Sequence, residues 1–317
     1  MKNNVNKSMI EGYIYQHSLK IKKVERSDSP NFGKEFISGE LEIATDEKCL
    51  NVLPVHFTYV TETTKSGAKN GTYAALKRII DSGKTVIVDG IENAMKVKCQ
   101  PSIALNDFYP QNQEELVSTP RNEGGFVTII TNFENSDPTK RSKFTTDILI
   151  NKVTHVDADP EKNISEDFVR VGGAIFNFRN DILPITFTVR AKGAMDYFEN
   201  LGVTGANPVY TQVWGRIVCS TIPVKKVTES AFGEDAVEMT SRKLKEYVIT
   251  GARKEPYEYG TPETITEDDI KKAVQDRNVM LAEVKKRSEE YYANKNGNVS
   301  FENNNANTSV PAGGFQF

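Results

Sequence analysis

The sequence has few of the residues that build cross-linked or metal-stabilised folds. Its 317 residues include three cysteines, Cys49, Cys99 and Cys219, which lie far apart and form no Cys-x-x-Cys pair. That spacing indicates neither a disulfide framework nor a zinc site. We therefore expect free thiols in a reducing compartment. No apolar secretion segment is present, and the cytoplasm is the expected location.

Signatures of enzymes are also missing. The sequence contains no GxxxxGK[ST] phosphate loop, no HExxH pair and no GxSxG elbow. Three histidines are present, His17, His56 and His155, and no spacing gives any of them a metal-ligating or acid–base partner. The acidic stretch "HVDADPEKN" lacks the glycine and terminal glutamate of a calcium loop, so we interpret it as a turn. We expect no catalysis, no metal and no cofactor.

Long apolar runs are absent, so we expect no membrane-spanning segment. A hydrophobic fraction of 38% and a charged fraction of 26% are typical of a soluble globular protein. The net charge of −3 provides no overall attraction for nucleic acid. Any binding of that kind must depend on a local basic patch.

One strand-like stretch occurs twice. "NVLPVHFTYV" at Asn51–Val60 is matched by "DILPITFTVR" at Asp181–Arg190, and each copy is followed by a helix-like stretch. Upstream, Leu41 aligns with Ile175. Downstream, Val88-Asp89-Gly90 aligns with Val213-Trp214-Gly215, so Asp89 takes the place of Trp214 in the first copy. Several features in the same order at a nearly constant offset predict a tandem duplication.

Alternation of apolar and polar residues at period 2 predicts five strands in the first copy. The predicted strands are Tyr15–Val24, Phe36–Ala44, Val52–Thr61, Thr85–Ile91 and Phe126–Phe133. A helix between the third and fourth strands gives the order of the OB-fold, a small five-stranded Greek-key barrel. The segment 96–123 has no assigned role in this scheme. In the second copy, Lys243–Ala252 is the predicted closing strand.

The C-terminal region changes character. Thr266 and Asp269 form a capping-box-like start for a helix over Glu267–Ala293, and an Asn-, Gly- and Ser-rich tail follows. We predict a mainly β protein with two tandem OB-fold-like five-stranded barrels, a C-terminal helix and a disordered tail. The predicted domains are 1–135, 136–260, 261–293 and 294–317.

Strand parity separates core positions from surface positions, because alternate side chains point to opposite faces. In the third strands the apolar parity places Leu53, Val55 and Phe57, and their counterparts Leu183, Ile185, Phe187 and Val189, in the cores. The opposite parity places aromatic and polar side chains on the outer surface of the second barrel. The predicted binding residues there are Phe176, Phe178, Arg179, Thr186, Arg190, Trp214 and Arg216.

That surface predicts a binding site for single-stranded nucleic acid. On OB-folds, bases stack on exposed aromatic rings while Lys and Arg meet the phosphates. In the first barrel the best basic patch comprises Lys20, Lys22 and Lys23 with Lys34, and Tyr13 and Tyr15 lie at its edge, although Glu40 and Glu42 oppose a full groove there.

The doubled strand motif and the C-terminal "PAGGFQF" resemble a bacteriophage-type single-stranded-DNA-binding protein built from two OB-folds. In such proteins a terminal Phe docks into replication and repair partners. Phe317 matches that residue, with Phe315 beside it, whereas the usual acidic residues are missing here. The resemblance implies non-catalytic, sequence-tolerant binding of single-stranded DNA in replication, recombination or repair, with protein partners at the tail.

A second hypothesis is an assembly protein that uses OB-like barrels for protein contacts. It predicts that Phe176, Phe178 and Trp214 are buried in a domain or subunit interface. The two hypotheses therefore differ in the exposure of three named side chains.

Overall fold

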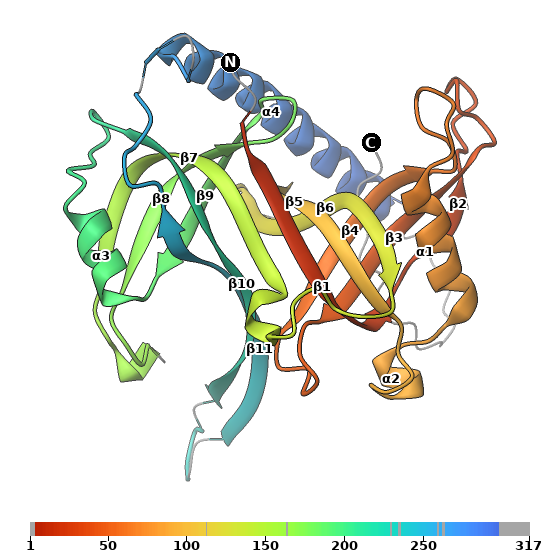
Figure 1. Cartoon of the computed structure of the whole chain (residues 1–317), viewed down its shortest axis with the longest axis horizontal. Helices are drawn as coiled ribbons and strands as arrows, with labels where there is room; N and C mark the ends of the chain where they lie inside the picture. Colours follow the sequence, from red (N-terminus) through yellow and green to blue (C-terminus); the bar gives the residue numbers. More distant parts are fainter. Residues whose placement is uncertain are drawn as a thin grey trace.

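The computed structural model describes residues 4–111, 113–162, 164–228, 230–233, 236–258, 260–261 and 264–297. Phe315 and Phe317 lie outside the described residues. Figure 1 shows two β-barrels side by side, with a long helix across both of them. None of the described helices is both long and apolar enough to cross a membrane.

The first barrel is closed by five strands. They are β1 (Asn6–His17), β3 (Glu35–Ala44), β4 (Val52–Thr61), β5 (Lys96–Phe108) and β6 (Val117–Ile130). Around the barrel the order is β1-β3-β4-β6-β5, and β1 pairs with both β3 and β5. The short strand β2 (Lys20–Lys23) extends the sheet beside β3, while α1 (Gly71–Ser82) and α2 (Val86–Asp89) lie between β4 and β5.

The second barrel repeats this plan. Its strands are β7 (Ser142–Val156), β8 (Phe168–Phe176), β9 (Ile182–Val189), β10 (Val209–Thr228) and β11 (Ala236–Ala252). The order is β7-β8-β9-β11-β10, closed by pairing of β10 with β7, and α3 (Lys192–Glu199) lies between β9 and β10. Short 3-10 turns lie at Pro138–Lys140 and Pro160–Lys162.

Each barrel has one parallel strand pair, β4 with β6 and β9 with β11. All other pairings are antiparallel. A helix between the third and fourth strands, and a parallel pair of the third and fifth, define the OB-fold order in both halves. The predicted fold class is therefore confirmed.

The predicted core positions of the third strands are confirmed. Leu53 and Val55 are fully buried, and their counterparts Leu183 and Ile185 have exposed fractions of 7% and 5%. These side chains belong to one large apolar cluster that extends through both barrels. Strand β4 has the predicted bounds, and helices α1 and α3 lie where the sequence pattern indicates.

The predicted strand at Thr85–Ile91 is wrong. Thr85 accepts a hydrogen bond from the Val88 amide, and the Asp89 carboxylate accepts one from the Thr85 amide at 2.8 Å. These two side chains close one helical turn, α2, and so override the strand preference of the valine- and isoleucine-rich run. The fourth strand is β5 instead, and the segment 96–123 forms most of a long β5–β6 hairpin.

The predicted alignment of the two copies is also wrong in its details. Ile43 pairs with Leu53 as Ile175 pairs with Leu183, so Ile43 and not Leu41 is the counterpart of Ile175. Trp214 lies in β10, the fourth strand, and its counterpart lies in β5 rather than at Asp89. The first strand begins at Asn6 and ends at His17, where the prediction placed it at Tyr15–Val24.

The two barrels are joined through their first strands, because Asn6–Ile10 of β1 pairs with Ser142–Thr146 of β7. The Asn51 side chain also reaches the second barrel, where its Oδ1 accepts the Cys219 amide at 2.7 Å. The Tyr247 hydroxyl donates to Asn122 Oδ1 at 3.0 Å in a buried contact between β11 and β6. The strand pairing and these two hydrogen bonds hold the barrels in one orientation.

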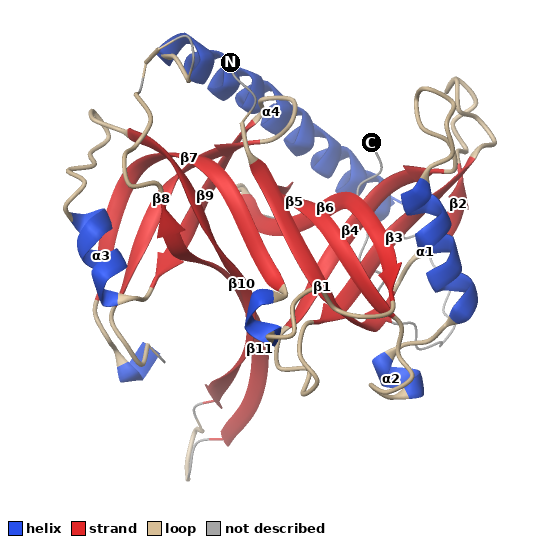
Figure 2. Ribbon diagram, viewed as in Figure 1, coloured by secondary structure: helices blue, strands red, loops and turns tan. Residues whose placement is uncertain are grey.

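Helix α4 (Glu267–Gly297) lies across both barrels, as Figure 2 shows. Its first turn has the predicted capping box, since Thr266 Oγ1 accepts the Asp269 amide and Asp269 accepts the Thr266 amide, each at 3.2 Å. Ile265 and Ala273 bury apolar surface against the second barrel. Arg277 forms an ion pair with Asp107 of the first barrel at 2.9 Å.

Candidate functional site

The structure distributes the predicted binding residues over four places. Trp214 and Arg216 lie on β10, and Thr186 and Arg190 on or just after β9. Phe178 and Arg179 occupy the turn between β8 and β9. Lys20, Lys22 and Lys23 lie on β2, which Figure 1 shows on the side of the molecule opposite α3, and Tyr15 lies on β1. The residues predicted for the outer surface of the second barrel therefore lie in separate places, because strand parity gives the face of each strand but not the positions of its neighbours.

Phe176 is not available to a ligand. It points away from the barrel core, as its parity predicts, yet it is fully buried in a second apolar cluster. Leu149 and Tyr210 flank it, and Ile265 and Ala273 from the C-terminal region cover it. The prediction that Phe176 is exposed is wrong because the C-terminal region packs on the outside of this barrel.

Trp214 is 41% exposed on the outer face of β10. Its indole packs against the backbone of its partner Gly251 on β11, where an added Cβ would lie 2.3 Å from Nε1. Gly251 therefore lets the ring lie against the strand, and a side chain at that position would displace it. The result is a fixed indole whose outer surface is open to solvent.

The strand register gives Trp214 basic neighbours that sequence reasoning missed. Trp214 pairs with Thr145 of β7, and Thr145 pairs with Lys7 of β1. Two residues further along β10, where the side chain points to the same face again, Arg216 pairs with Lys143. Paired residues in antiparallel strands share a face, with Cβ atoms about 5 Å apart. We call this surface the Trp214 patch, and it comprises Lys7, Lys143, Thr145, Trp214 and Arg216.

The cations of the Trp214 patch are exposed. Within the part of the chain that the structure describes, no ion pair involves Lys7, Lys143 or Arg216. The neighbouring Asp147 is buried and engaged, because it accepts the Val5 amide at 2.8 Å and the Gln212 amide group at 2.9 Å. The hydrogen bond from Thr139 lowers the pKa of Asp137, and Arg216 lies close enough to that carboxyl to lower its pKa further. The patch thus presents three cations beside an aromatic ring.

A second basic face lies on β8 and β9. The guanidinium groups of Arg170 and Arg190 lie 5.5 and 5.2 Å from the ring centre of the buried Phe168. Arg190 also binds Glu246 at 2.9 Å, which offsets part of its charge. The exposed Thr186 lies on this face, aligned through Gly172 with the exposed Lys152. Sequence reasoning identified Thr186 and Arg190 and missed Lys152 and Arg170.

Phe178 is 87% exposed at the β8–β9 turn, and the Arg179 guanidinium lies 5.2 Å from its ring centre. The Asn177 side chain accepts the amides of Arg179 and Asp181 and holds the turn. Phe178 thus has the predicted exposure, but it belongs to an end of the barrel and not to the Trp214 patch.

In the first barrel, Lys20, Lys22 and Lys23 are exposed on the edge strand β2, and Tyr15 is half-buried on β1. Lys23 lies 3.8 Å from Glu35, a long and exposed ion pair. Sequence reasoning missed Phe126 on β6, which is 73% exposed.

The outer face of β3 and β4 is closed by ion pairs. Glu40 binds His56 at 2.9 Å, and Lys243 of β11 binds Glu42 at 3.3 Å. The hydrogen bond from His56 lowers the pKa of Glu40 from its usual range. Lys245 of β11 is half-buried near this face, and burial lowers its pKa to about 8. The first barrel therefore uses this face to contact the second.

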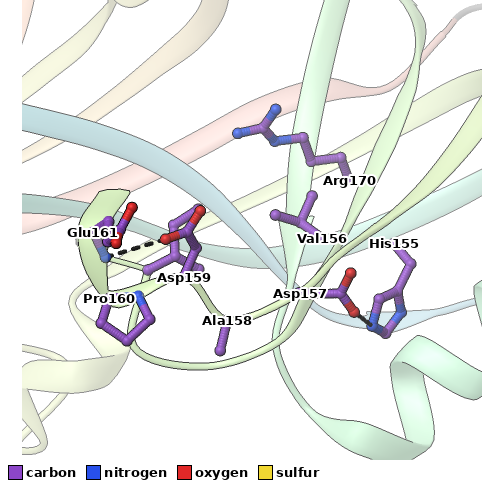
Figure 3. Close-up of a pocket in the computed structure, with 9 residues that line it drawn as sticks. His155, Val156, Asp157, Ala158, Asp159, Pro160, Glu161 and Arg170 are labelled. Atoms are coloured by element: carbon purple, nitrogen blue, oxygen red, sulfur yellow. Dashed lines mark hydrogen bonds and ion pairs between the residues drawn. The ribbon is translucent and has the colours of Figure 1, made fainter.

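An open pocket of about 650 Å³ lies where β7 meets the acidic loop, and Figure 3 shows its lining. His155 Nδ1 lies 2.7 Å from Glu199 Oε1, and Nε2 lies 3.5 Å from Asp157. The hydrogen bond with Glu199 raises the pKa of His155. Asp167 completes an exposed group of three possible metal ligands, but it accepts the Ala158 amide at 2.7 Å. The contact of His155 with Glu199 ties the end of β7 to α3, and the contact of Asp167 with Ala158 fixes the acidic loop.

The fold and this site define a tandem OB-fold protein with a fixed tryptophan among unpaired cations. A family model described as YorF matches residues 6–287, and the chain belongs to that family. No curated protein matches the chain. Among solved structures, the chain is similar to the wild-type single-stranded DNA binding protein from Thermus aquaticus, with a TM-score of 0.45 and 10% identity over 81% of this chain and 95% of that one. A deletion mutant of the same protein gives a TM-score of 0.46 and 11% identity, over 83% of this chain and 100% of the other.

Proposed function

We propose that this protein binds single-stranded DNA without strong sequence preference and without catalysis. The observation that carries the proposal is the Trp214 patch, where one open indole lies beside Lys7, Lys143 and Arg216. A base stacked on an aromatic side chain contributes about 1–3 kcal/mol, and every base has a face that can stack. Cations beside the ring would bind the adjacent phosphates, so that a chain of net charge −3 attracts DNA locally.

The position of the patch supports a binding surface that extends beyond one strand. Its three strands are β10, β7 and β1, and the last of these belongs to the first barrel. The second basic face, with Lys152 and Arg170, lies on β7 and β8 of the same barrel, beyond the cluster of Leu149 and Phe176 that the C-terminal region covers. A strand that stacks on Trp214 would therefore meet a further cation directly on the β1 side, at Lys7.

We infer a role in replication, recombination or repair in the cytoplasm of a bacterial cell, with the chain encoded by a bacteriophage. The C-terminal Phe315 and Phe317 are the proposed docking residues for protein partners in that process.

The assembly hypothesis requires a partner that covers Phe178 and Trp214, because both are exposed in the single chain. Phe176 is buried by the chain's own C-terminal region and so provides no evidence for an external partner. Nothing else in the patch favours a protein ligand, since three unpaired cations are uncommon at the core of a protein interface.

Fluorescence titration tests the proposal directly, because Trp214 is the single tryptophan of the chain. We expect oligo(dT) to quench its emission at low salt, and affinity to fall steeply as salt rises. Trp214→Phe should retain most of the affinity measured by anisotropy of a labelled oligonucleotide, and Trp214→Ala should lose about ten-fold or more. Lys285→Gln on α4 serves as a control for a charge change elsewhere. Equal affinities of the wild type and Trp214→Ala would refute the role of the patch.

A further inference from the structure

The β10–β11 hairpin continues well beyond the second barrel. Pairing of β10 with β7 ends at Arg216, whereas its pairing with β11 runs on to Thr228 and Ala236. The base of this arm is tied to the first barrel through Asn51 and Cys219. From Cys219 to Thr228 the ribbon is about 30 Å long at ~3.3 Å per residue. Figure 1 shows it projecting away from both barrels.

The tip of the arm presents an exposed aromatic side chain. Phe232 is 90% exposed, and the Ser230 hydroxyl accepts its amide hydrogen at 3.3 Å. Burial of a phenylalanine side chain is favourable, so its exposure at the end of a ribbon is unfavourable for an isolated chain. Within three residues of Phe232, the sequence contains Glu229, Glu234 and Asp235.

A pocket of complementary character lies at the opposite end of β11. It has a volume of about 290 Å³ and is lined by Ala194, Tyr197 and Phe198 at α3 and by Ile249 and Ala252 of β11. Arg253 and Lys254, the next two residues, also line it. The Tyr197 hydroxyl donates to the Arg253 carbonyl at 3.0 Å and holds the two sides together. The pocket is therefore apolar with a cationic margin.

We propose that the Phe232 tip of one copy inserts into this pocket on a second copy of the chain. The pocket is large enough for a phenyl ring, and the acidic sequence of the tip complements Arg253 and Lys254. The contact must join two molecules, because tip and pocket lie at opposite ends of the same strand. Ala236 and Ile249 are 13 residues apart on β11, about 40 Å in an extended strand.

This geometry produces a head-to-tail contact. Each copy offers one tip and one pocket, so a third copy can dock on the second by the same contact. Unless the rotation between copies closes a ring, such a contact builds an open row. The self-association does not depend on DNA binding, but its effect on DNA binding, cooperativity, rests on the proposed function. Gly251 lines the pocket and supports Trp214, so a docked tip would lie close to the Trp214 patch of the next copy. Neighbouring copies would then bind a long single strand cooperatively.

Sedimentation velocity of the full chain, without DNA and at low salt, tests the contact. We expect the wild type to form dimers and larger species as its concentration rises into the tens of micromolar. Phe232→Ser should remove the tip and Ala194→Phe should fill the pocket, and each variant alone should be monomeric. Phe32→Ser is the matched control, because Phe32 is also exposed, at 59%, but lies in a loop of the first barrel.

Mixing the two defective variants is the decisive measurement. Phe232→Ser retains an intact pocket, and Ala194→Phe retains an intact tip. A head-to-tail contact therefore predicts that an equimolar mixture forms a 1:1 dimer and nothing larger. A monomeric wild type, or a mixture that stays monomeric, would overturn the proposal. Loss of self-association on removal of residues 298–317 would also overturn it, because the occupant of the pocket would then be the C-terminal tail.

Binding to DNA separates this proposal from the proposed function. Phe232→Ser should bind a short oligo(dT), long enough for one copy, with wild-type affinity, and should lose cooperativity on long poly(dT). A weaker affinity for the short oligonucleotide would identify the tip as a DNA contact and contradict the inference. If no variant binds DNA but the mixture still dimerises, the proposed function fails and the contact stands.

Discussion

Arg277 of α4 donates a hydrogen bond to Asp107 of β5 at 2.9 Å, and the two side chains are 9% and 7% exposed. This buried ion pair connects the C-terminal helix to the first barrel. Ala273, one helical turn earlier, packs with Phe176 on the second barrel. The helix therefore bridges the two barrels, and its position explains why Phe176 is closed to any ligand.

Loss of one partner of this pair should destabilise the protein. Arg277→Met leaves the Asp107 carboxylate buried without its cation, which typically costs about 3–5 kcal/mol. Urea denaturation followed by circular dichroism measures the change. The double variant Arg277→Met with Asp107→Leu should recover most of the loss, because it removes both buried charges. A single variant as stable as the wild type would show that the pair contributes nothing.

Gly251→Ala should move the indole of Trp214. The added Cβ would lie 2.3 Å from Nε1, far inside van der Waals contact, so the ring must leave the strand. We expect a shift in the Trp214 emission spectrum, a loss of about 1–3 kcal/mol in unfolding free energy and weaker binding to oligo(dT). Gly205→Ala is the matched control, since nothing lies within 4 Å of a Cβ at that position. Unchanged emission from Gly251→Ala would contradict the described packing.

The cations of the Trp214 patch should contribute to the salt dependence of DNA binding. Each phosphate contact adds about 0.7 to the slope of log K against log salt for single strands. Lys143→Gln and Arg216→Gln should each reduce the slope by roughly that amount, and together by about twice as much. Isothermal titration at several salt concentrations provides the slopes. If Lys285→Gln reduces the slope equally, the effect belongs to overall charge and not to the patch.

The ion pair between His155 and Glu199 should stabilise the protein at acidic pH only. Its hydrogen bond raises the pKa of His155 above the ordinary value of 6.5. The contribution is therefore complete below pH 6.5 and is lost as pH rises through the folded-state pKa. The Tm difference between the wild type and His155→Gln should be largest near pH 5.5 and should vanish at high pH.

His17 should show the opposite pH dependence from His155, because burial lowers its pKa. Its protonation opposes folding, so the wild type should lose stability from this residue as pH falls below 6.5. The variants His155→Gln and His17→Gln should therefore show opposite trends in thermal melts over the same pH range. The same trend in both would contradict the assignment.

Lys245 should destabilise the folded protein at neutral pH. Burial lowers its pKa to about 8, whereas the unfolded chain keeps the ordinary value of 10.5. Folding releases a proton between these values, so stability should rise with pH from 8 to 10.5. Lys245→Met should remove that rise and should increase the unfolding free energy at pH 7 by about 1–2 kcal/mol, allowing for solvent screening. Lys243→Met should have no such effect, since Lys243 is exposed and paired with Glu42.

Local pattern was sufficient for several parts of this fold. The alternation in Val52–Thr61 identified the third strand and its buried residues, because one face of a barrel strand must be apolar. Thr266 and Asp269 identified the start of α4, because a capping box acts within one turn of helix. The doubled third-strand motif and its helix indicated two barrels of one kind, and the structure contains them.

The same reasoning failed at two local irregularities and at one long-range contact. Thr85–Ile91 has the composition of a strand, yet a cap formed by Thr85 and Asp89 closes it into a helical turn. The true fourth strand was missed because its alternation breaks at Pro101, where the register of β5 shifts. Phe176 has the parity of a surface residue, and its burial depends on a helix that begins 91 residues later, at Glu267.

The two barrels, their third strands and the residues that fill their cores follow from the amino-acid pattern, because period-2 alternation and the capping box of α4 are local properties of the chain. The candidate site follows from the three-dimensional arrangement of the strands. Lys7, Lys143 and Trp214 are neighbours because β1, β7 and β10 are hydrogen-bonded in one register, and that register is a property of long-range strand pairing.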